Sequence, residues 1–167
     1  LPKFAEIFGY DFEGNGIHII SAGGKNQVVK LFYNFADVLK IPIFVLLDKD
    51  AEDNFNQIKP KLKPKDRIYI LKNGEFEDIL PLDLIKRSLN YGLNNLSVLE
   101  ENIFESDTGM VKILEEIFRH RGLHEFKKAE FAHLVSNQII NGADISNEIK
   151  IIINEIKNTS NYNKSLI

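Results

Sequence analysis

Short apolar runs alternate with longer amphipathic stretches along the first half of the chain. Residues 43–47 are five consecutive apolar residues, with the length and the β-branched and aromatic content of a strand buried on both faces. Residues 16–21 and 67–71 are two further runs of strand length. We therefore expect three strands, and the fully apolar run is of the kind found in parallel sheets.

Apolar residues recur at helical spacing between and after these runs. The predicted helices are residues 2–8, 27–39, 51–58, 82–89, 110–120, 128–140 and 146–156. Residues 90–108 are polar and irregular, and residues 158–167 are polar enough to predict a frayed terminus.

Strands that alternate with helices predict an α/β fold with a parallel sheet flanked by helices, followed by a C-terminal helical extension. We expect residues 1–90 to form the α/β core and residues 91–167 to form a helical region packed on it.

Composition narrows the functional classes. The chain has 167 residues and no cysteine, which excludes disulfides and thiolate metal sites and suits a reducing, cytoplasmic location. No apolar run approaches the length of a membrane helix, so we expect no membrane partner. The net charge of −3 is not that of a strongly basic nucleic-acid binder, but it leaves DNA open, since an acidic metal site binds phosphate through its cation.

Asp48 and Asp50 directly follow the apolar run 43–47. Open α/β sheets bind their ligands just outside the carboxyl ends of such strands, and carboxylates are ligands for hard cations such as Mg²⁺. The alternative is that the two acids simply end the strand and cap the next helix.

Two other segments are expected at the same edge of a parallel sheet. The backbone N–H groups of Gly23 and Gly24 and the ammonium of Lys25 are suited to hold a phosphate, although a tight turn explains the same glycines. Glu75, Glu77 and Asp78 follow the third strand. With Asp48 and Asp50, Glu77 is positioned to converge on one or two divalent ions, an arrangement that serves phosphoryl transfer.

The remaining charged clusters carry less information. The lysine and proline run of residues 59–65 is better explained as a solvated loop stiffened by its prolines than as a DNA contact. His120 and His124 are four residues apart, but Gly122 between them is expected to end the helix, so structural or surface roles are favoured. The chain has no Walker P-loop, nucleophile elbow or dinucleotide fingerprint.

Three segments in this order give the chain a specific resemblance: LPKFAEIFG (residues 1–9), GIHIISAGGK (residues 16–25) and IPIFVLLDKD (residues 41–50). Together they resemble the TOPRIM domain of OLD-family (overcoming lysogenization defect) ATP-dependent nucleases. The resemblance covers residues 1–80 well and the helical tail more loosely, through KKAEFA (residues 127–132).

The resemblance implies a Mg²⁺- or Mn²⁺-dependent DNA endonuclease domain with a TOPRIM-like, Rossmannoid sheet. Such a domain is normally attached to an N-terminal ABC-type ATPase, so ATP enters only through that separate domain. The family's metal-binding acid pair falls on Asp48 and Asp50, and its later acid falls best on Glu77, whereas Glu75 takes the place of a small polar residue. A late catalytic lysine falls on Lys128, with Lys127 as the second choice; an ordinary surface lysine is the alternative for Lys128.

One motif of the family has no counterpart here. A strand that ends in a Val-Glu-Gly-like turn is expected before Leu1, where it supplies a carboxylate and a strand beside residues 43–47. Without it the sheet keeps an open edge, which invites pairing with another chain. We therefore expect either that a preceding segment belongs to the native protein or that the chain fills the gap as a homo-oligomer.

Two other functional classes use similar residues. Haloacid-dehalogenase-type phosphatases and nucleotide-sugar glycosyltransferases also end a strand in Asp-x-Asp, but phosphatases place the motif near the first strand and follow it with a hydroxyl residue, whereas Ala51 and Glu52 follow here. A receiver-like or degenerate TOPRIM module with a binding role and no catalysis is the non-enzymatic alternative.

Overall fold

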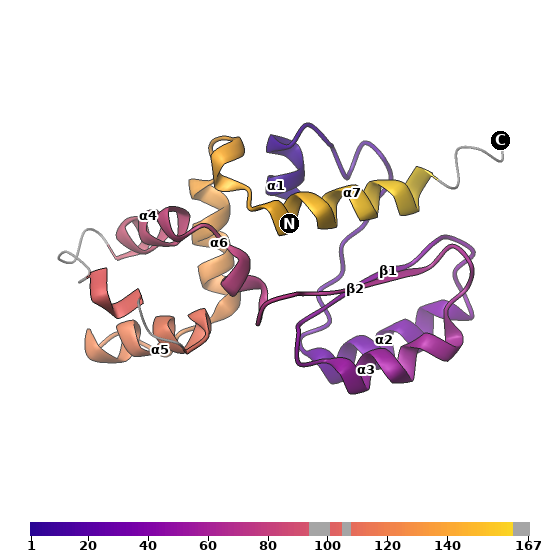
Figure 1. The fold of residues 1–167 in the computed structure, drawn as a ribbon, viewed down its shortest axis with the longest axis horizontal. Coiled ribbons are helices and arrows are strands. Elements are labelled where there is room, and N and C mark those ends of the chain that lie inside the picture. Colours follow the sequence, from indigo (N-terminus) through magenta and orange to yellow (C-terminus); the bar gives the residue numbers. More distant parts are fainter. Residues whose placement is uncertain (94–100, 105–107, 162–167) are drawn as a thin grey trace. The chain divides into compact units, whose positions relative to one another are not determined.

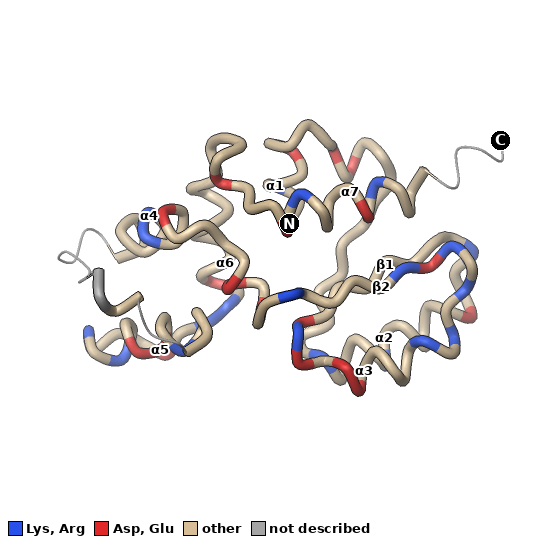
Figure 2. Tube along the Cα trace, viewed as in Figure 1, with Lys and Arg blue, Asp and Glu red and all other residues tan. Residues whose placement is uncertain are grey.

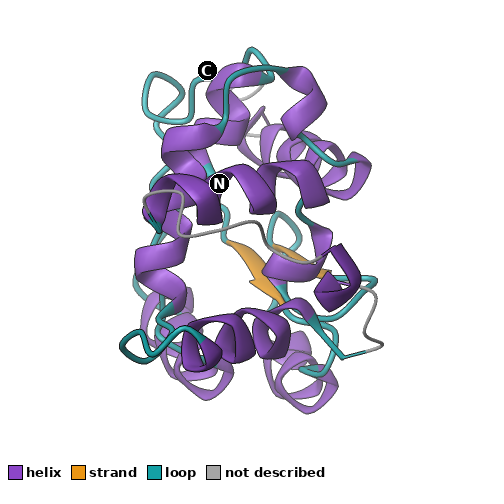
Figure 3. Cartoon of the chain, turned by 90° about the vertical axis from the view of Figure 1, so that its left-hand side faces the viewer, coloured by secondary structure: helices purple, strands orange, loops and turns teal. Residues whose placement is uncertain are grey.

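The structure is a computed structural model that describes residues 1–93, 101–104 and 108–161. Over these residues the fold is mixed α/β, with seven α-helices and one two-stranded parallel sheet (Figures 1 and 3). The chain divides into two compact units. The helical unit comprises Leu1–Tyr10 and Gly74–Ser146, and the sheet unit comprises Asp11–Asn73 and Asn147–Ile167.

The sheet unit is built on one strand–helix–strand crossover. The elements are α2 (Lys25–Ala36), β1 (Phe44–Leu47), α3 (Glu52–Ile58), the 3-10 turn η1 (Lys59–Lys61), β2 (Arg67–Ile70) and α7 (Asn147–Asn161). β1 and β2 pair in parallel with Phe44 opposite Arg67 and Leu47 opposite Ile70. The predicted strands at residues 43–47 and 67–71 are thus confirmed, together with their parallel direction.

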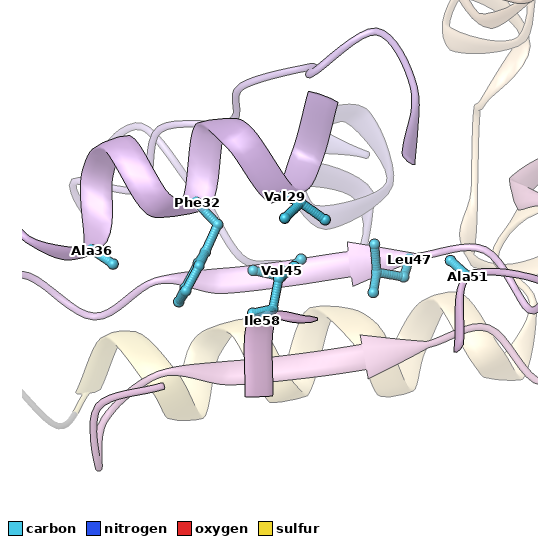
Figure 4. Close-up of a cluster of buried hydrophobic side chains, with 7 residues drawn as sticks. All are labelled: Val29, Phe32, Ala36, Val45, Leu47, Ala51 and Ile58. Atoms are coloured by element: carbon cyan, nitrogen blue, oxygen red, sulfur yellow. The ribbon is translucent and has the colours of Figure 1, made fainter. Parts of the chain in front are cut away.

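One apolar cluster holds α2 and α3 against the sheet. Val45 and Leu47 alternate with the half-buried Phe44 and Leu46 along β1, as expected for side chains that point to opposite faces. Figure 4 shows α2 directing its buried side chains toward β1. The buried members of the cluster are Val29, Phe32, Ala36, Val45, Leu47, Ala51 and Ile58.

The C-terminal helix α7 lies on the opposite side of the sheet from α2 (Figures 1 and 4). Its Glu148 carboxylate accepts a hydrogen bond from the backbone N–H of Lys72 at 2.7 Å and one from the Tyr69 hydroxyl at 3.4 Å. Burial, and then the neighbouring Glu148 charge, raise the pKa of Tyr69 above its ordinary value. These contacts tie α7 to the end of β2.

The strand predicted at residues 16–21 is wrong. The described chain contains no strand there, and Ile19 and Ile20 are 48% and 58% exposed. A strand needs a neighbour to pair with, and β1 pairs only with β2 among the described residues. The apolar composition of residues 16–21 suits a strand, but the described part of the sheet offers that segment no partner.

The helical unit is formed by helices and short 3-10 turns. Its elements are α1 (Pro2–Ile7), η2 (Phe76–Ile79), α4 (Leu82–Gly92), η3 (Glu101–Phe104), α5 (Met110–His120), α6 (Lys128–Gln138) and η4 (Gly142–Asp144). α4 packs along α6. Phe126 lies between Phe118 and Phe131, with ring centroids 5.4 and 5.7 Å away, and anchors the α5–α6 connection.

Asp78 joins the segment after β2 to helix α5. Its carboxylate accepts hydrogen bonds from the backbone N–H of Glu75 at 2.7 Å and of Met110, the first residue of α5, at 2.6 Å. The second bond satisfies one of the free N–H groups at the helix N-terminus. Asp78, one of the three acids after the third strand, therefore has a structural role.

Gly74 is required beside this carboxylate. Its φ is +49°, a left-handed conformation, and an added Cβ would collide with the Asp78 side chain, which its two hydrogen bonds hold in place. We expect Gly74→Ala to lower the free energy of unfolding by about 2 kcal/mol, measured by urea denaturation. Gly142→Ala is the control, because open space surrounds that position, and should cost less than about 0.5 kcal/mol. Equal losses would contradict the explanation.

The predicted helices are present with shifted ends. α2 ends at Ala36 rather than at residue 39, and α7 runs to Asn161, into the segment predicted to fray. Residues 94–100 and 105–107 of the predicted irregular segment, and residues 162–167 of the predicted frayed end, lie outside the described residues. None of the described helices has the length and apolar character that crossing a membrane requires. The predicted division at residue 90 does not coincide with the two units and remains a prediction.

Candidate functional site

Asp48 and Asp50 lie in the tight turn that connects β1 to α3. The turn is closed by a hydrogen bond from the Ala51 backbone N–H to the Asp48 carbonyl at 3.1 Å, and the Ala51 side chain is fully buried in the core cluster. The turn is thus anchored at Leu47 and Ala51. Asp48 is half-buried, and the Asp50 side chain is 71% exposed.

The glycine loop meets this turn. Gly23 and Gly24 have φ values of +78° and +140°, which favour glycine, and open space surrounds both. They lead into α2, whose first residue is Lys25, and the Lys25 Nζ lies 2.5 Å from Asp50 Oδ2. The predicted neighbourhood of the loop and the acid pair is therefore present within the sheet unit.

Asn54 holds the two segments together and was not predicted. This α3 residue is only 4% exposed, and its side-chain amide donates to the Lys25 carbonyl at 3.3 Å and to Asn26 Oδ1 at 3.1 Å. A buried amide on a short helix costs free energy unless it is paired, so Asn54 fixes the start of α2 beside the Asp48–Asp50 turn. The sequence signal was a polar residue at a core-facing helix position.

Opposite charges gather at this edge of the sheet unit. Figure 2 shows acidic positions where β1 runs into α3, and Glu52 and Asp53 occupy the first turn of that helix. Lys25 and the N-terminus of α2 supply positive charge beside them. The half-buried Asp48 and the exposed Asp50, next to a helix N-terminus, suit a hard cation that retains water or phosphate ligands, as Mg²⁺ commonly does.

The other predicted site residues lie in the helical unit. Glu77 is 8% exposed in η2, whereas Glu75 is half-buried and forms an ion pair with Lys128 at the start of α6. Lys127 pairs instead with Glu130, at 3.1 Å. Lys128 therefore lies beside one of the three acids that follow β2, and that acid is Glu75.

The sheet unit brings Lys25, Asp50 and the glycine loop together, and the helical unit brings Glu75 and Lys128 together. Within neither unit do three His, Asp or Glu side chains of the described residues gather closely enough to hold a metal ion. The convergence of Glu77 with Asp48 and Asp50 remains a prediction.

Comparison with known families concerns the site residues of the sheet unit, which are the glycine loop, Lys25 and the acid pair. Residues 1–50 match the family described as "Overcoming lysogenization defect protein-like, TOPRIM domain". The matched segment includes the glycine loop and ends at Asp50, so it supports the TOPRIM resemblance for the residues that carry the acid pair. TOPRIM domains generally belong to nuclease- and primase-type enzymes and typically bind divalent metals.

A similar protein exists in Methanocaldococcus jannaschii. It is the uncharacterized protein MJECL43, which is 25% identical over 154 residues that cover 82% of this chain. The match spans 40% of the length of that relative. No solved structure matches the chain.

Proposed function

We propose that this chain is the divalent-metal-dependent DNA endonuclease domain of an OLD-family ATP-dependent nuclease. One observation carries the proposal: the matched TOPRIM segment ends in an acid pair at the carboxyl end of a parallel strand, with a lysine against the second acid. The reaction is phosphodiester hydrolysis. The proposed partners are DNA, an N-terminal ABC-type ATPase of the parent protein and further copies of the chain.

Each residue has a proposed role. Asp48 and Asp50 hold Mg²⁺ or Mn²⁺, which when bound activates water and stabilises charge on phosphate oxygens. Lys25 and the N–H groups at the start of α2 orient the phosphate beside the acids. Lys128 balances the charge that develops on the transferring phosphate. Glu77 is the proposed later ligand, and Glu75, which is more exposed and paired with Lys128, is its proposed substitute.

The proposed site needs a further carboxylate, and the sheet needs a further strand. The described residues pair only one edge of β1, and the apolar Ile19 and Ile20 lie exposed in the same unit. A strand from a preceding segment of the parent chain or from a second copy would satisfy the open edge. Size-exclusion chromatography with light scattering, on chains with and without upstream sequence, distinguishes the two sources.

A cleavage assay tests the function. The chain, expressed with its upstream sequence, is incubated with supercoiled plasmid DNA and Mn²⁺, and nicked and linear products are separated on agarose. We expect cleavage that EDTA abolishes. A preparation that leaves the plasmid intact, although it binds Mn²⁺ in calorimetry, would overturn the nuclease proposal and leave a metal-binding module.

Lys25 provides a more discriminating prediction. Its ammonium competes with a bound cation for the Asp50 carboxylate, and exposed ion pairs of this type contribute about 0.2–1 kcal/mol. We therefore expect Lys25→Gln to tighten Mn²⁺ binding by about two- to fivefold in calorimetry while it weakens DNA cleavage. Lys30→Gln, an exposed lysine further along α2, should change neither. Weaker Mn²⁺ binding in Lys25→Gln would argue against metal binding at Asp50.

A non-catalytic module is the second candidate. It is favoured by the absence of a three-acid cluster within either unit across the described residues. A receiver-like or degenerate TOPRIM domain of this kind would bind a partner without cutting DNA. Metal binding that stabilises the chain, with no cleavage after the upstream sequence is restored, is the result expected of it.

A further inference from the structure

The amino ends of the two strands carry a concentration of positive charge. Because β1 and β2 are parallel, the segments at their amino ends, residues 37–43 and 59–67, meet at the end of the sheet opposite Asp48. The two segments line a shallow hollow of about 240 Å³, to which Lys40 and Pro42 contribute from one side and Lys63 and Lys65 from the other. We call this surface the lysine edge.

The charge of the lysine edge is opposite to that of the whole chain. Residues 37–43 and 59–67 contain two acids, Asp37 and Asp66, and a larger set of cations: Lys40, Lys59, Lys61, Lys63, Lys65 and Arg67. Six positive and two negative side chains give a local charge of +4, against −3 for the chain. In Figure 2 the positive positions of this unit gather at the end of the strands away from the acidic turn.

Two charged side chains of the lysine edge build its framework. Asp66 is 3% exposed, and its two carboxylate oxygens accept hydrogen bonds from the backbone N–H groups of Ile43 and Lys63, each at 2.9 Å. The Lys63 ammonium donates to the carbonyls of Ala36 and Leu39 at the end of α2, the second at 3.1 Å. Asp66 and Lys63 thus fix the two segments to each other and to α2.

The remaining lysines are available for an external anion. The side chains of Lys40, Lys61 and Lys65 form no ion pair or hydrogen bond with any described residue, and these lysines lie in segments stiffened by Pro42, Pro60 and Pro64. Proline restricts the backbone, so less conformational entropy is lost when these segments bind. The lysine edge therefore presents pre-positioned point charges.

We propose that the lysine edge binds the sugar–phosphate backbone of a nucleic acid. Lysine ammonium groups recognise phosphate as point charges without reading bases, and the shallow hollow offers no aromatic platform for stacking. The choice of nucleic acid as the polyanion rests on the proposed function. An acidic protein or an anionic membrane is a competing outcome of the test.

The dimensions of the sheet fit such a contact. Four residues per strand span about 13 Å at about 3.3 Å per residue, which is the length of about four base pairs. A duplex that runs along the strands from the Asp48–Asp50 turn therefore reaches the lysine edge within half a helical turn. The surface would hold the substrate while the acid pair faces a phosphate further along.

The test measures DNA binding without cleavage. Fluorescence anisotropy of a labelled 20-base-pair duplex is recorded in EDTA over a range of salt concentrations, with the full chain and a triple variant, Lys40→Gln, Lys61→Gln and Lys65→Gln. We expect the variant to bind at least about tenfold more weakly at 100 mM salt and to lower the slope of log K against log salt by about 2–3, because each lost phosphate contact removes about 0.9. Lys63 is left unchanged because it caps α2.

A matched triple variant controls for net charge. Lys30→Gln, Lys112→Gln and Lys150→Gln remove the same charge outside the lysine edge and should change the affinity by less than about twofold. Equal weakening in both triple variants, or no binding by the unmodified chain, would overturn the proposal. Binding to phosphatidylserine vesicles but not to DNA would also overturn it. Because EDTA is present throughout, a failure of the metal site leaves this measurement unaffected.

Discussion

Asp48→Asn should reduce Mn²⁺-dependent cleavage of plasmid DNA by about 100-fold or more. The change keeps the size of the side chain and removes the negative charge that the proposed site uses to hold a cation at the end of β1. Loss of one charge-stabilising group commonly costs a factor of about 10²–10³ in rate, and a lost metal ligand should cost at least as much. Asp50→Asn is expected to behave in the same way.

Calorimetry separates a lost ligand from a lost fold. Both variants should lose Mn²⁺ binding while their circular dichroism spectra stay unchanged, because a backbone hydrogen bond from Ala51 to Asp48 and the buried Ala51 side chain anchor the turn that carries both carboxylates. Asp53→Asn is the matched control: this exposed carboxylate lies nearby in the first turn of α3 and has no proposed role, so the cleavage rate of the variant should stay within about twofold. Unchanged cleavage in Asp48→Asn would refute the metal site.

Asp144→Ala should destabilise the helical unit strongly, with a loss of about 3 kcal/mol in the free energy of unfolding. The Asp144 carboxylate is 4% exposed and accepts hydrogen bonds from the backbone N–H groups of Ile140 and Asn141 and from Arg87 of α4, the last at 2.5 Å. Its removal leaves the partly buried Arg87 guanidinium without its counter-charge. Urea denaturation measures the loss.

The dependence of the unfolding free energy on pH in the acid range provides a second test of Asp144. Burial alone would raise the pKa of Asp144, but the hydrogen bonds from Ile140, Arg87 and Asn141 outweigh it and hold the pKa below its ordinary value of 3.8. A lowered pKa in the folded state stabilises the protein above pH 3.8, and this contribution disappears as the pH falls below that value. The stability difference between wild type and Asp144→Ala should therefore shrink in that range.

Asp83→Ala is the control for this pair of measurements. Asp83 is an exposed acid in the first turn of α4, so its loss should cost less than about 0.5 kcal/mol. If Asp144→Ala and Asp83→Ala lowered the unfolding free energy equally, the Arg87–Asp144 contact would not hold α4 to the segment after α6.

The spacing of apolar residues predicted those helices and strands whose formation depends mainly on their own sequence. The helix at residues 110–120 and the strands at 43–47 and 67–71 are present, because apolar spacing reports directly which face is buried. Helix ends depend on contacts from elsewhere, such as the Lys63 ammonium on the last carbonyls of α2. A strand depends on its neighbour, so residues 16–21 could not be assigned from their own composition.

The contacts of the candidate site likewise include some that the sequence predicted and some that it did not. The sequence placed Lys25 near Asp50 on the basis of a strand at residues 16–21, which the described chain lacks. In the structure the packing of α2 on β1 and the Asn54 side chain bring the two segments together. The pairing of Lys128 with Glu75 depends on how η2 turns, and residue types two positions apart do not show which of two acids is the more exposed. The role of Asn54 depends on a contact between helices.

The path of the chain through its two units limits how they can be separated. The chain crosses between the units after residues 10, 73 and 146, so no single cut releases either of them. The bond between the Lys72 backbone and Glu148 holds together the two points between which residues 74–146 are inserted. Insertions of this type are accommodated where the two flanking points lie close together. A short linker from residue 73 to residue 147 should therefore yield a self-contained sheet unit, whereas truncation after residue 146 removes one side of its core.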